Sequence, residues 1–425
     1  MTAVRPFRAL RYDAALVDLD RVIAPPYDVV TAEERKHYWE RDPHGAIRLE
    51  LTREVGDEAT TDYAEVAEAL AAWQRAGVLR RDARPAIYGL RQRFRGPQGE
   101  LRTREGFFAL LHLEDYARRV VRPHERTLAG PKADRLKLLR ATRANLSSIF
   151  LLYEDPEREL SGLLTSRLDG APLLSARDGA GVEHALVAIE DGAALAAVER
   201  FLAERPVVIA DGHHRYETAL AYRDERRRSE RSGDDAPFEW TLGYFTDAYA
   251  PGSLLLPIHR VVRERAVPSD AEWASRLPGW RAERVACPAA EEIPALLARH
   301  LVPLADRPAF AADDGSGVLR VLSRAPVEPG ELGIRAIHAE VLARVFGLDE
   351  AAVRDGAVAF PKHALEAARD VREGRGTVAL YLNPLRPEQV FRVTGAGELL
   401  PQKSTFFMPK IPTGLVFRPL DEPAP

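Results

Sequence analysis

The stretch PVVIADGHHRYETALAYRDE, residues 206–225, predicts the element around which the rest of the fold is arranged. The short apolar run at 207–210 is typical of a buried strand, and it stops at an acid and a glycine. The residues that follow have the composition of a helix. The stretch therefore predicts a strand that turns tightly into a helix. The polar residues of this turn are Asp211, Gly212, His213, His214 and Arg215.

Such a turn has the chemistry of an anion site. Backbone N–H groups at the start of a helix, together with the helix dipole, attract phosphate. Gly212 allows the backbone to approach a ligand closely, and the Arg215 guanidinium matches phosphate geometry. Asp211 would repel phosphate unless it binds a metal or accepts a proton. The alternative is that Asp211 is a helix N-cap and that the two histidines are solvated or form hydrogen bonds that serve the fold.

Composition excludes several classes of protein. The chain has 425 residues, which favours two or three lobes, and its formal net charge of -4 gives no indication of nucleic-acid binding. A single cysteine, Cys287, rules out a disulfide within the chain and fits a cytoplasmic location. The sequence contains no apolar run of membrane-spanning length, so no membrane partner is expected, and His and Cys show no zinc-ligand spacing.

The pattern along the chain predicts a mixed α/β (α+β) fold with mixed sheets. Residues 86–94 and 105–113 read as paired strands around the turn RGPQGE, and 388–395 also reads as a strand. Thr31 with Glu34 predicts a capping box at a helix start. Three regions are expected. They are an N-terminal α/β region at 1–115, a core at 116–265, and a C-terminal α/β region at 266–425.

Four segments together resemble a known family. They are IAPPYDV (23–29), VVRPHERT (120–127), IADGHHRYE (209–217) and PQKSTFFMPK (401–410). This set resembles the bacterial and archaeal family called domain of unknown function 1015. Three of the segments are also similar, more distantly, to ADP-dependent free-serine kinases. Those kinases belong to the ParB/sulfiredoxin-like fold, in which a strand–turn–helix element binds nucleotide phosphate. The gap between Glu125 and Asp211 is longer here than in the kinases.

The resemblance implies roles for individual residues. Glu125 corresponds to the catalytic base, although the residues alone favour a surface acid or a partner for Arg126. Asp211 corresponds to a residue that handles a proton or a Mg²⁺ ion, and the nucleotide implied is ADP or ATP. The turn residues 212–215 and the late segment, Lys403, Ser404 and Thr405, correspond to phosphate-binding positions. QKST lacks the glycine-rich loop of a Walker site. The substrate-binding positions expected are His124, Tyr27 and Asp28.

Two functions follow as hypotheses. The first is phosphotransfer on free serine or O-phosphoserine, in the direction of a kinase or of a phosphatase, with serine or phosphoserine and a nucleotide as small-molecule partners. The second is a regulatory protein that binds a nucleotide or a phosphometabolite without chemistry. The sequence does not indicate which direction or which oligomeric state applies.

Overall fold

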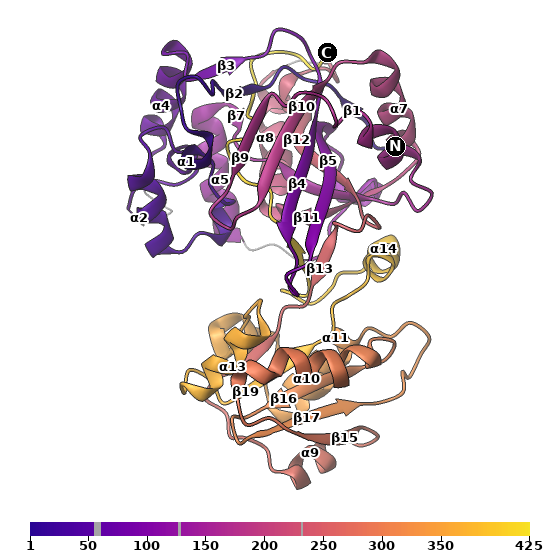
Figure 1. The fold of residues 1–425 in the computed structure, drawn as a ribbon. Coiled ribbons are helices and arrows are strands. Elements are labelled where there is room, and N and C mark those ends of the chain that lie inside the picture. Colours follow the sequence, from indigo (N-terminus) through magenta and orange to yellow (C-terminus); the bar gives the residue numbers. More distant parts are fainter. Residues whose placement is uncertain (55–60, 126–128, 231–232) are drawn as a thin grey trace. The chain divides into compact units, whose positions relative to one another are not determined.

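The computed structural model describes residues 1–54, 61–125, 129–230 and 233–425, and the chain divides into two compact units (Figure 1). Unit 1 comprises Met1–Leu254 and Pro409–Pro425, and unit 2 comprises Leu255–Met408. The chain therefore leaves unit 1 once and returns to it for its last residues. Residues 126 and 127 of the PHERT segment lie outside the described residues.

Unit 1 is built on a large mixed sheet. Within the described residues this sheet has nine strands, in the order β6-β11-β8-β12-β5-β4-β10-β9, and β1 also pairs with β5. Strands β6 and β11 pair in parallel, as do β8 and β12, and the other pairs are antiparallel. The strands of the sheet are β1 (Val4–Arg5), β4 (Ile87–Arg95), β5 (Leu101–His112), β6 (Val121–Arg122), β8 (Ile149–Tyr153), β9 (Leu174–Arg177), β10 (Glu183–Ile189), β11 (Val207–Asp211) and β12 (Trp240–Asp247).

Two short ladders and a set of helices complete unit 1. The ladders pair β2 (Leu10–Tyr12) with β3 (Leu79–Arg81), and β7 (Ala144–Asn145) with β21 (Arg418–Pro419). Helices α5 and α8 pack against each other, and α7 packs beside β1. None of the helices in the described part of the chain is long and apolar enough to cross a membrane. The helices are α1 (Leu19–Val22), α2 (Ala32–Arg41), α3 (Ile47–Glu50), α4 (Ala64–Arg75), α5 (Ala129–Thr142), α6 (Glu159–Thr165), α7 (Gly192–Ala203) and α8 (His213–Ser229).

The predicted strand pair and the predicted capping box are both present. Strands β4 and β5 form an antiparallel pair, and the Thr31 side chain accepts from Glu34 N–H at the start of α2. The sheet also unites regions that the sequence suggested were separate. Strand β5 of the expected region 1–115 pairs with β12 of the expected region 116–265, so both regions contribute strands to one sheet of unit 1.

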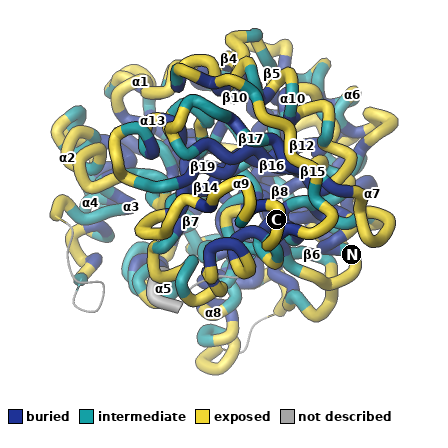
Figure 2. Tube along the Cα trace, turned by 90° about the horizontal axis from the view of Figure 1, so that it is seen from below, coloured by how far each residue is buried: buried dark blue, intermediate teal, exposed yellow. Residues whose placement is uncertain are grey.

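Unit 2 has its own mixed α/β core. Among the described residues its main sheet has the order β15-β17-β16-β19-β14-β18, and β13 pairs with β20. Figure 2 shows β16 and β19 in the colour of buried residues, whereas α2 of unit 1 is largely exposed. The strands are β13 (Leu254–Leu256), β14 (Arg260–Val262), β15 (Arg281–Ala286), β16 (Ala309–Asp313), β17 (Val318–Ser323), β18 (Val358–Ala359), β19 (Val378–Leu382) and β20 (Phe406–Met408). The α-helices are α9 (Asp270–Arg276), α10 (Ile293–His300), α11 (Gly333–Ala336), α12 (Glu350–Ala352), α13 (Ala364–Arg372) and α14 (Pro387–Gly395).

The prediction of a strand at 388–395 is wrong, because this segment forms helix α14. Pro387 occupies the first turn, where its missing N–H removes no helical bond. The Gln389 side chain accepts from Arg386 N–H and closes the start of the helix. Val390, Phe391 and Thr394 are buried together, as helical spacing requires. The β-branched residues that suggested a strand lie on the packed face of this helix.

Two buried carboxylates end adjacent strands of the unit 1 sheet. Asp155 follows β8 and Asp247 ends β12, and each is 2% exposed. Both Asp155 oxygens accept from backbone N–H groups, those of Glu159 at 2.8 Å and Ser161 at 2.7 Å. Oδ1 of Asp247 accepts from the N–H groups of Asp155 and Tyr249. Burial, followed by the charge of Asp155, raises the pKa of Asp247 to about 6.

We predict that Asp247→Asn stabilises the protein at pH 7.5. The native carboxyl has a folded-state pKa above its unfolded value, so its contribution to stability is present below about pH 4 and is lost as pH rises through about 6. An asparagine keeps the Oδ1 acceptor without the charge. The midpoint of urea unfolding should rise by the equivalent of roughly 1–3 kcal/mol at pH 7.5 and change little at pH 4.

The matched control is Asp155→Asn, which loses one of two acceptors for backbone N–H groups and should destabilise the protein at pH 7.5. A urea midpoint lower for Asp247→Asn than for wild type at pH 7.5 would contradict the conclusion that the ionised Asp247 carboxylate destabilises the folded protein.

Candidate functional site

The turn after β11 has the strand–turn–helix form that the sequence predicts. The pairing of β11 with β8 shifts register between Ile209 and Asp211, which re-aims the end of the strand. Gly212 follows with φ +90°, and α8 begins at His213. A Cβ at Gly212 would lie 3.0 Å from Nε of Arg215. Glycine is therefore required both for the backbone conformation and for the position of the Arg215 side chain.

Asp211 lies between two cations. Its Oδ1 accepts from Nζ of Lys410 at 2.6 Å, and its Oδ2 accepts from Nη2 of Arg215 at 2.7 Å. The side chain of Asp211 is 16% exposed, that of Lys410 is 18% exposed and that of Arg215 is 10% exposed. Burial acts to raise the pKa of Asp211, but the charges of Lys410 and Arg215 outweigh it and hold this pKa below its ordinary range. Asp211 is therefore an ionised carboxylate that orients two positive groups.

Arg215 is fixed from a second side. Its Nη1 donates to the carbonyl oxygen of Ser148, just before β8. The first backbone bond of α8 runs from Tyr216 N–H to the Gly212 carbonyl, so the N–H groups of residues 213–215 precede the helical ladder. The first turn of α8 therefore presents backbone N–H groups that make no helical bond, and Asp211 holds two cations beside them. This combination of donors and positive charge suits the binding of an anion.

His124 and His213, whose rings contact each other at the turn, are both buried and uncharged. His124 N–H donates to Nε2 of His213 at 3.3 Å, and Nδ1 of His124 lies 2.6 Å from the Ile209 carbonyl oxygen, to which it donates. Burial, helped by the neighbouring imidazole, holds the pKa of His213 well below its ordinary value, and burial also lowers the pKa of His124. A neutral His213 that accepts at Nε2 carries its proton on Nδ1.

Glu125 lies beside this histidine pair. Its Oε1 is 3.8 Å from Nδ1 of His213, and its side chain is 29% exposed. The carboxylate therefore faces the protonated edge of a neutral imidazole and remains accessible to solvent. Burial also lowers the pKa of His214, whose electrostatic neighbours include Glu125. The predicted base and the predicted turn thus lie in one corner of unit 1.

Tyr27 and Asp28 also reach this corner, from a short 3-10 helix at Tyr27–Val29. The Tyr27 ring lies 4.4 Å beneath the Arg135 guanidinium. Burial raises the pKa of Tyr27, and removal from water followed by the charge of Asp211 raises the pKa of Asp28. Arg215 and Lys410 oppose the rise at Asp28. The structure therefore brings together the predicted residues 27, 28, 124, 125 and 211–215.

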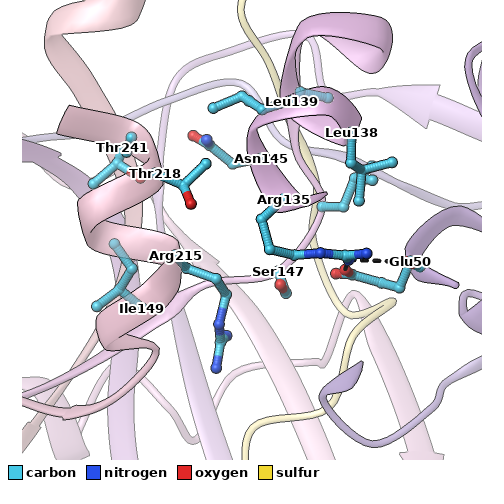
Figure 3. A pocket seen from close by; sticks show the side chains of 13 residues that line it. Glu50, Arg135, Leu138, Leu139, Asn145, Ser147, Ile149, Arg215, Thr218 and Thr241 are labelled. Carbon is cyan, nitrogen blue, oxygen red and sulfur yellow. Dashed lines mark hydrogen bonds and ion pairs between the residues drawn. The ribbon is translucent and has the colours of Figure 1, made fainter. Parts of the chain in front are cut away.

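A small cavity lies beside Arg215, between α5 and α8, and has a mainly apolar lining with a few polar atoms (Figure 3). Its volume is about 50 Å³, which suits a few water molecules and is far below the size of a nucleotide pocket. Arg135, on α5, donates to Glu50 at one wall. In the described part of the chain, Oε1 of Glu50, Nε of Arg215 and Oγ1 of Thr218 have no hydrogen-bond partner. Ordered water fits these atoms.

The lysine that contacts Asp211 is one that sequence reasoning missed. Lys403, Ser404 and Thr405 belong to unit 2, and their predicted phosphate contact stays a prediction. Lys410 lies in the same PQKSTFFMPK segment but follows the return of the chain to unit 1. The chain has six lysines, and the rarity of this residue type in an Arg-rich sequence was the signal that could have singled out Lys410.

The residues around Asp211 do not fit the magnesium role that the resemblance implies. Mg²⁺ binds through one or two carboxylates whose oxygens are available to it. Both oxygens of Asp211 already accept from cations, and the described residues contain no group of three or more His, Cys, Asp or Glu side chains placed to hold a metal ion.

Comparisons with solved structures find distant likeness. A free serine kinase mutant in complex with ADP is 12% identical, with a TM-score of 0.36, and the match covers 72% of this chain and 92% of that one. A conserved hypothetical protein from Pyrococcus furiosus is 11% identical, with a TM-score of 0.35, over 74% of this chain and 96% of that one. SbnI with a C-terminal truncation, from Staphylococcus aureus, is 12% identical, with a TM-score of 0.33, over 74% and 87%.

Comparison with curated proteins finds no match. A family model does match, over residues 4–286, which is more than half of the chain and includes the APPYD, PHERT and DGHHR segments. The PQKSTFFMPK segment lies beyond that match. On this coverage, the chain belongs to the family described as proteins of unknown function, DUF1015.

Proposed function

We propose that the chain transfers a phosphoryl group to or from free serine, at the turn of residues 211–215. The observation that carries this proposal is the pairing of Asp211 with both Lys410 and Arg215 beside the start of α8. This pairing holds two cations next to helix N–H groups, which is an arrangement for phosphate. The choice of serine or O-phosphoserine rests on the resemblance of the PHE and DGHHR segments to the free-serine kinases, and ADP or ATP would be the nucleotide.

The residues divide the chemistry between them. Arg215, Lys410 and the first N–H groups of α8 would bind and orient the phosphate, and the fixed charges would stabilise its transferring oxygens. Glu125 would accept the proton of the serine hydroxyl in the kinase direction. In hydrolysis of O-phosphoserine, which is a separate reaction, Glu125 would accept a proton from the attacking water and return it to the serine oxygen as the O–P bond breaks, so that serine and inorganic phosphate are released. The Nδ1–H of His213, 3.8 Å from Glu125, would orient that carboxylate.

A second function is favoured by one observation. Asp211 has both oxygens engaged by cations, so this part of the turn contributes binding and not proton or metal chemistry. A regulatory protein that binds a nucleotide or a phosphometabolite at this turn, without turnover, needs no more than that.

Phosphorus NMR on the purified protein separates the two functions. The samples are serine with ADP, serine with ATP, and O-phosphoserine alone, each with a divalent cation in the buffer. The proposed enzyme should produce a new phosphorus resonance in at least one sample. Silence in all three, together with measurable nucleotide binding by calorimetry, would favour the regulatory protein.

We predict that Glu125→Gln abolishes turnover and leaves ligand binding nearly unchanged. The amide preserves the shape of the side chain but cannot accept a proton, and loss of a general base typically lowers the rate by about 10²–10⁴-fold. The rate is measured by the same phosphorus assay and the affinity for ADP by calorimetry. Glu217→Gln is the matched control. Glu217 lies on α8, and its Oε2 accepts a hydrogen bond from Nζ of Lys132 at 2.8 Å. Full activity in Glu125→Gln would remove Glu125 from the mechanism.

We predict that Lys410→Met weakens ADP binding by about 10–100-fold, the order expected for loss of a hydrogen bond between charged groups. The variant also leaves Asp211 with one cation in place of two, which makes the turn less positive. Calorimetry on Lys410→Met and on Lys36→Met, whose native lysine is exposed on α2, gives the comparison. Lys403→Met tests in parallel whether the lysine predicted from the sequence contributes. Equal affinities of wild type and Lys410→Met would exclude Lys410 from the anion site.

We predict that Asp28→Asn tightens anion binding, and does so more at high pH than at low pH. The pKa of Asp28 is raised, so its negative charge beside the turn appears only as pH rises through that value and then repels phosphate. The variant should bind ADP roughly threefold to tenfold more tightly than wild type at pH 8. The ratio of the two affinities, measured at pH 5 and pH 8, cancels the titration of ADP itself. Equal affinities of wild type and Asp28→Asn at pH 8 would show that Asp28 does not face the anion.

A further inference from the structure

The chain returns from unit 2 to unit 1 at Pro409, directly before Lys410. The backbone is held at both residues by side chains of the central sheet. Nη2 of Arg104 donates to the Pro409 carbonyl oxygen at 2.6 Å, and Nε2 of Gln92 donates to the Lys410 carbonyl oxygen at 3.4 Å. The two residues that hold this backbone lie on neighbouring strands, β5 and β4.

These side chains form a row across three strands, set by the strand register. Gln92 is the cross-strand neighbour of Arg104 on one side and of His184 on the other. Oε1 of Gln92 accepts from Nε and Nη2 of Arg104 at 2.9 and 2.5 Å. Nε2 of Gln92 faces Nδ1 of His184 at 3.3 Å, and Nε2 of His184 donates to Asp178 at 2.9 Å. The amide of Gln92 therefore has one orientation that satisfies all of its neighbours.

Arg104 is an unusual residue for the centre of a sheet. It is fully buried, and its guanidinium carbon lies 4.7 Å from the Phe150 ring centroid and 5.6 Å from that of Tyr244. Among the described residues no carboxylate forms an ion pair with it, and its hydrogen bonds go to the Gln92 amide and the Pro409 carbonyl. Burial accordingly lowers its pKa. A buried cation without a counter-charge is costly, and an apolar residue would serve the stability of the sheet as well or better.

We propose that Arg104 and Gln92 are positioning residues for Lys410. They hold the backbone of residues 409–410 in the place from which the Lys410 ammonium meets Oδ1 of Asp211. The expected effect on ligand affinity rests on the proposed anion-binding function, whereas the placement of Lys410 does not. One measurement therefore tests the placement of Lys410, and a second tests the effect on ligand affinity.

The first measurement is the rate at which each lysine is acetylated, followed by mass spectrometry on the ligand-free protein. Six lysines make the peptide analysis simple, and exposed Lys36 is the internal reference. In wild type the ammonium of Lys410 is protected by Asp211. In Arg104→Met the rate at Lys410 relative to Lys36 should rise about tenfold, the order expected when one hydrogen bond to a charged group is lost. An unchanged rate at Lys410 in folded Arg104→Met would overturn the proposal.

The second measurement is a double-mutant cycle on ADP affinity. If Arg104 acts through Lys410, Arg104→Met and Lys410→Met should weaken binding to a similar degree, and the double variant should be no weaker than Lys410→Met alone. A merely structural arginine would add its own loss to that of Lys410→Met, and additive losses would overturn the proposal. Arg93→Met, an exposed arginine on β4, is the matched control and should change neither measurement.

Two further outcomes are also decisive. If wild type binds neither ADP nor ATP nor O-phosphoserine, the proposed function fails, and the acetylation rates alone decide the role of Arg104. If Arg104→Met does not fold, Arg104→Lys replaces it. Lysine keeps the charge but lacks the fork that reaches both the Gln92 amide and the Pro409 carbonyl. In Arg104→Lys the acetylation rate of Lys410, relative to that of Lys36, should lie between its value in wild type and its value in unfolded protein. A relative rate equal to that of wild type would overturn the proposal.

Discussion

The carboxylate of Asp211 is the group around which the candidate site is organised. A largely buried carboxylate must be paired, and here it is paired twice, with Arg215 four residues along the chain and with Lys410 at a separation of 199 residues. The local pair fixes the start of α8 and makes glycine necessary at 212. The distant pair joins the end of the chain to the end of β11. Loss of the carboxylate would remove one contact from each of the two cations at once.

Burial separates the site into two parts with different charge. On one side the Asp211 carboxylate lies between Lys410 and Arg215, and its charge raises the pKa of Arg215 against the effect of burial. On the other side His124 and His213 are neutral because burial disfavours the imidazolium, and a hydrogen bond between them sets the tautomer. A phosphate and a hydroxyl have opposite requirements, since the first needs fixed positive charge and the second needs a proton acceptor. The Glu125 carboxylate lies on the neutral side, beside His213.

The sequence predicted the parts of this arrangement that depend on neighbours along the chain. The strand, the glycine turn and the helix at 207–225 are local patterns, as are the β4–β5 pair and the capping box at Thr31. The partner of Asp211 could not be found in this way, because an ion pair between residues 211 and 410 leaves no local signal. Proximity to a recognised motif favoured Lys403, seven residues away. The helix at 387–395 was missed for the opposite reason, since its β-branched residues indicated a strand while its caps and burial decided the outcome.

The order of the chain places a constraint on how the site is completed. Unit 2 occupies residues 255–408, between the last strand of the unit 1 sheet and the segment that supplies Lys410. A chain that ended at residue 254 would contain the β11 turn, Glu125 and both histidines, yet Asp211 would have one cation only. Closing so long a loop costs conformational entropy that grows slowly with its length, so a few strong contacts at the point of return are enough to fix it. The bonds from Arg104 and Gln92 to the carbonyls of 409 and 410 are contacts of this kind, made by residues that the sheet has already placed.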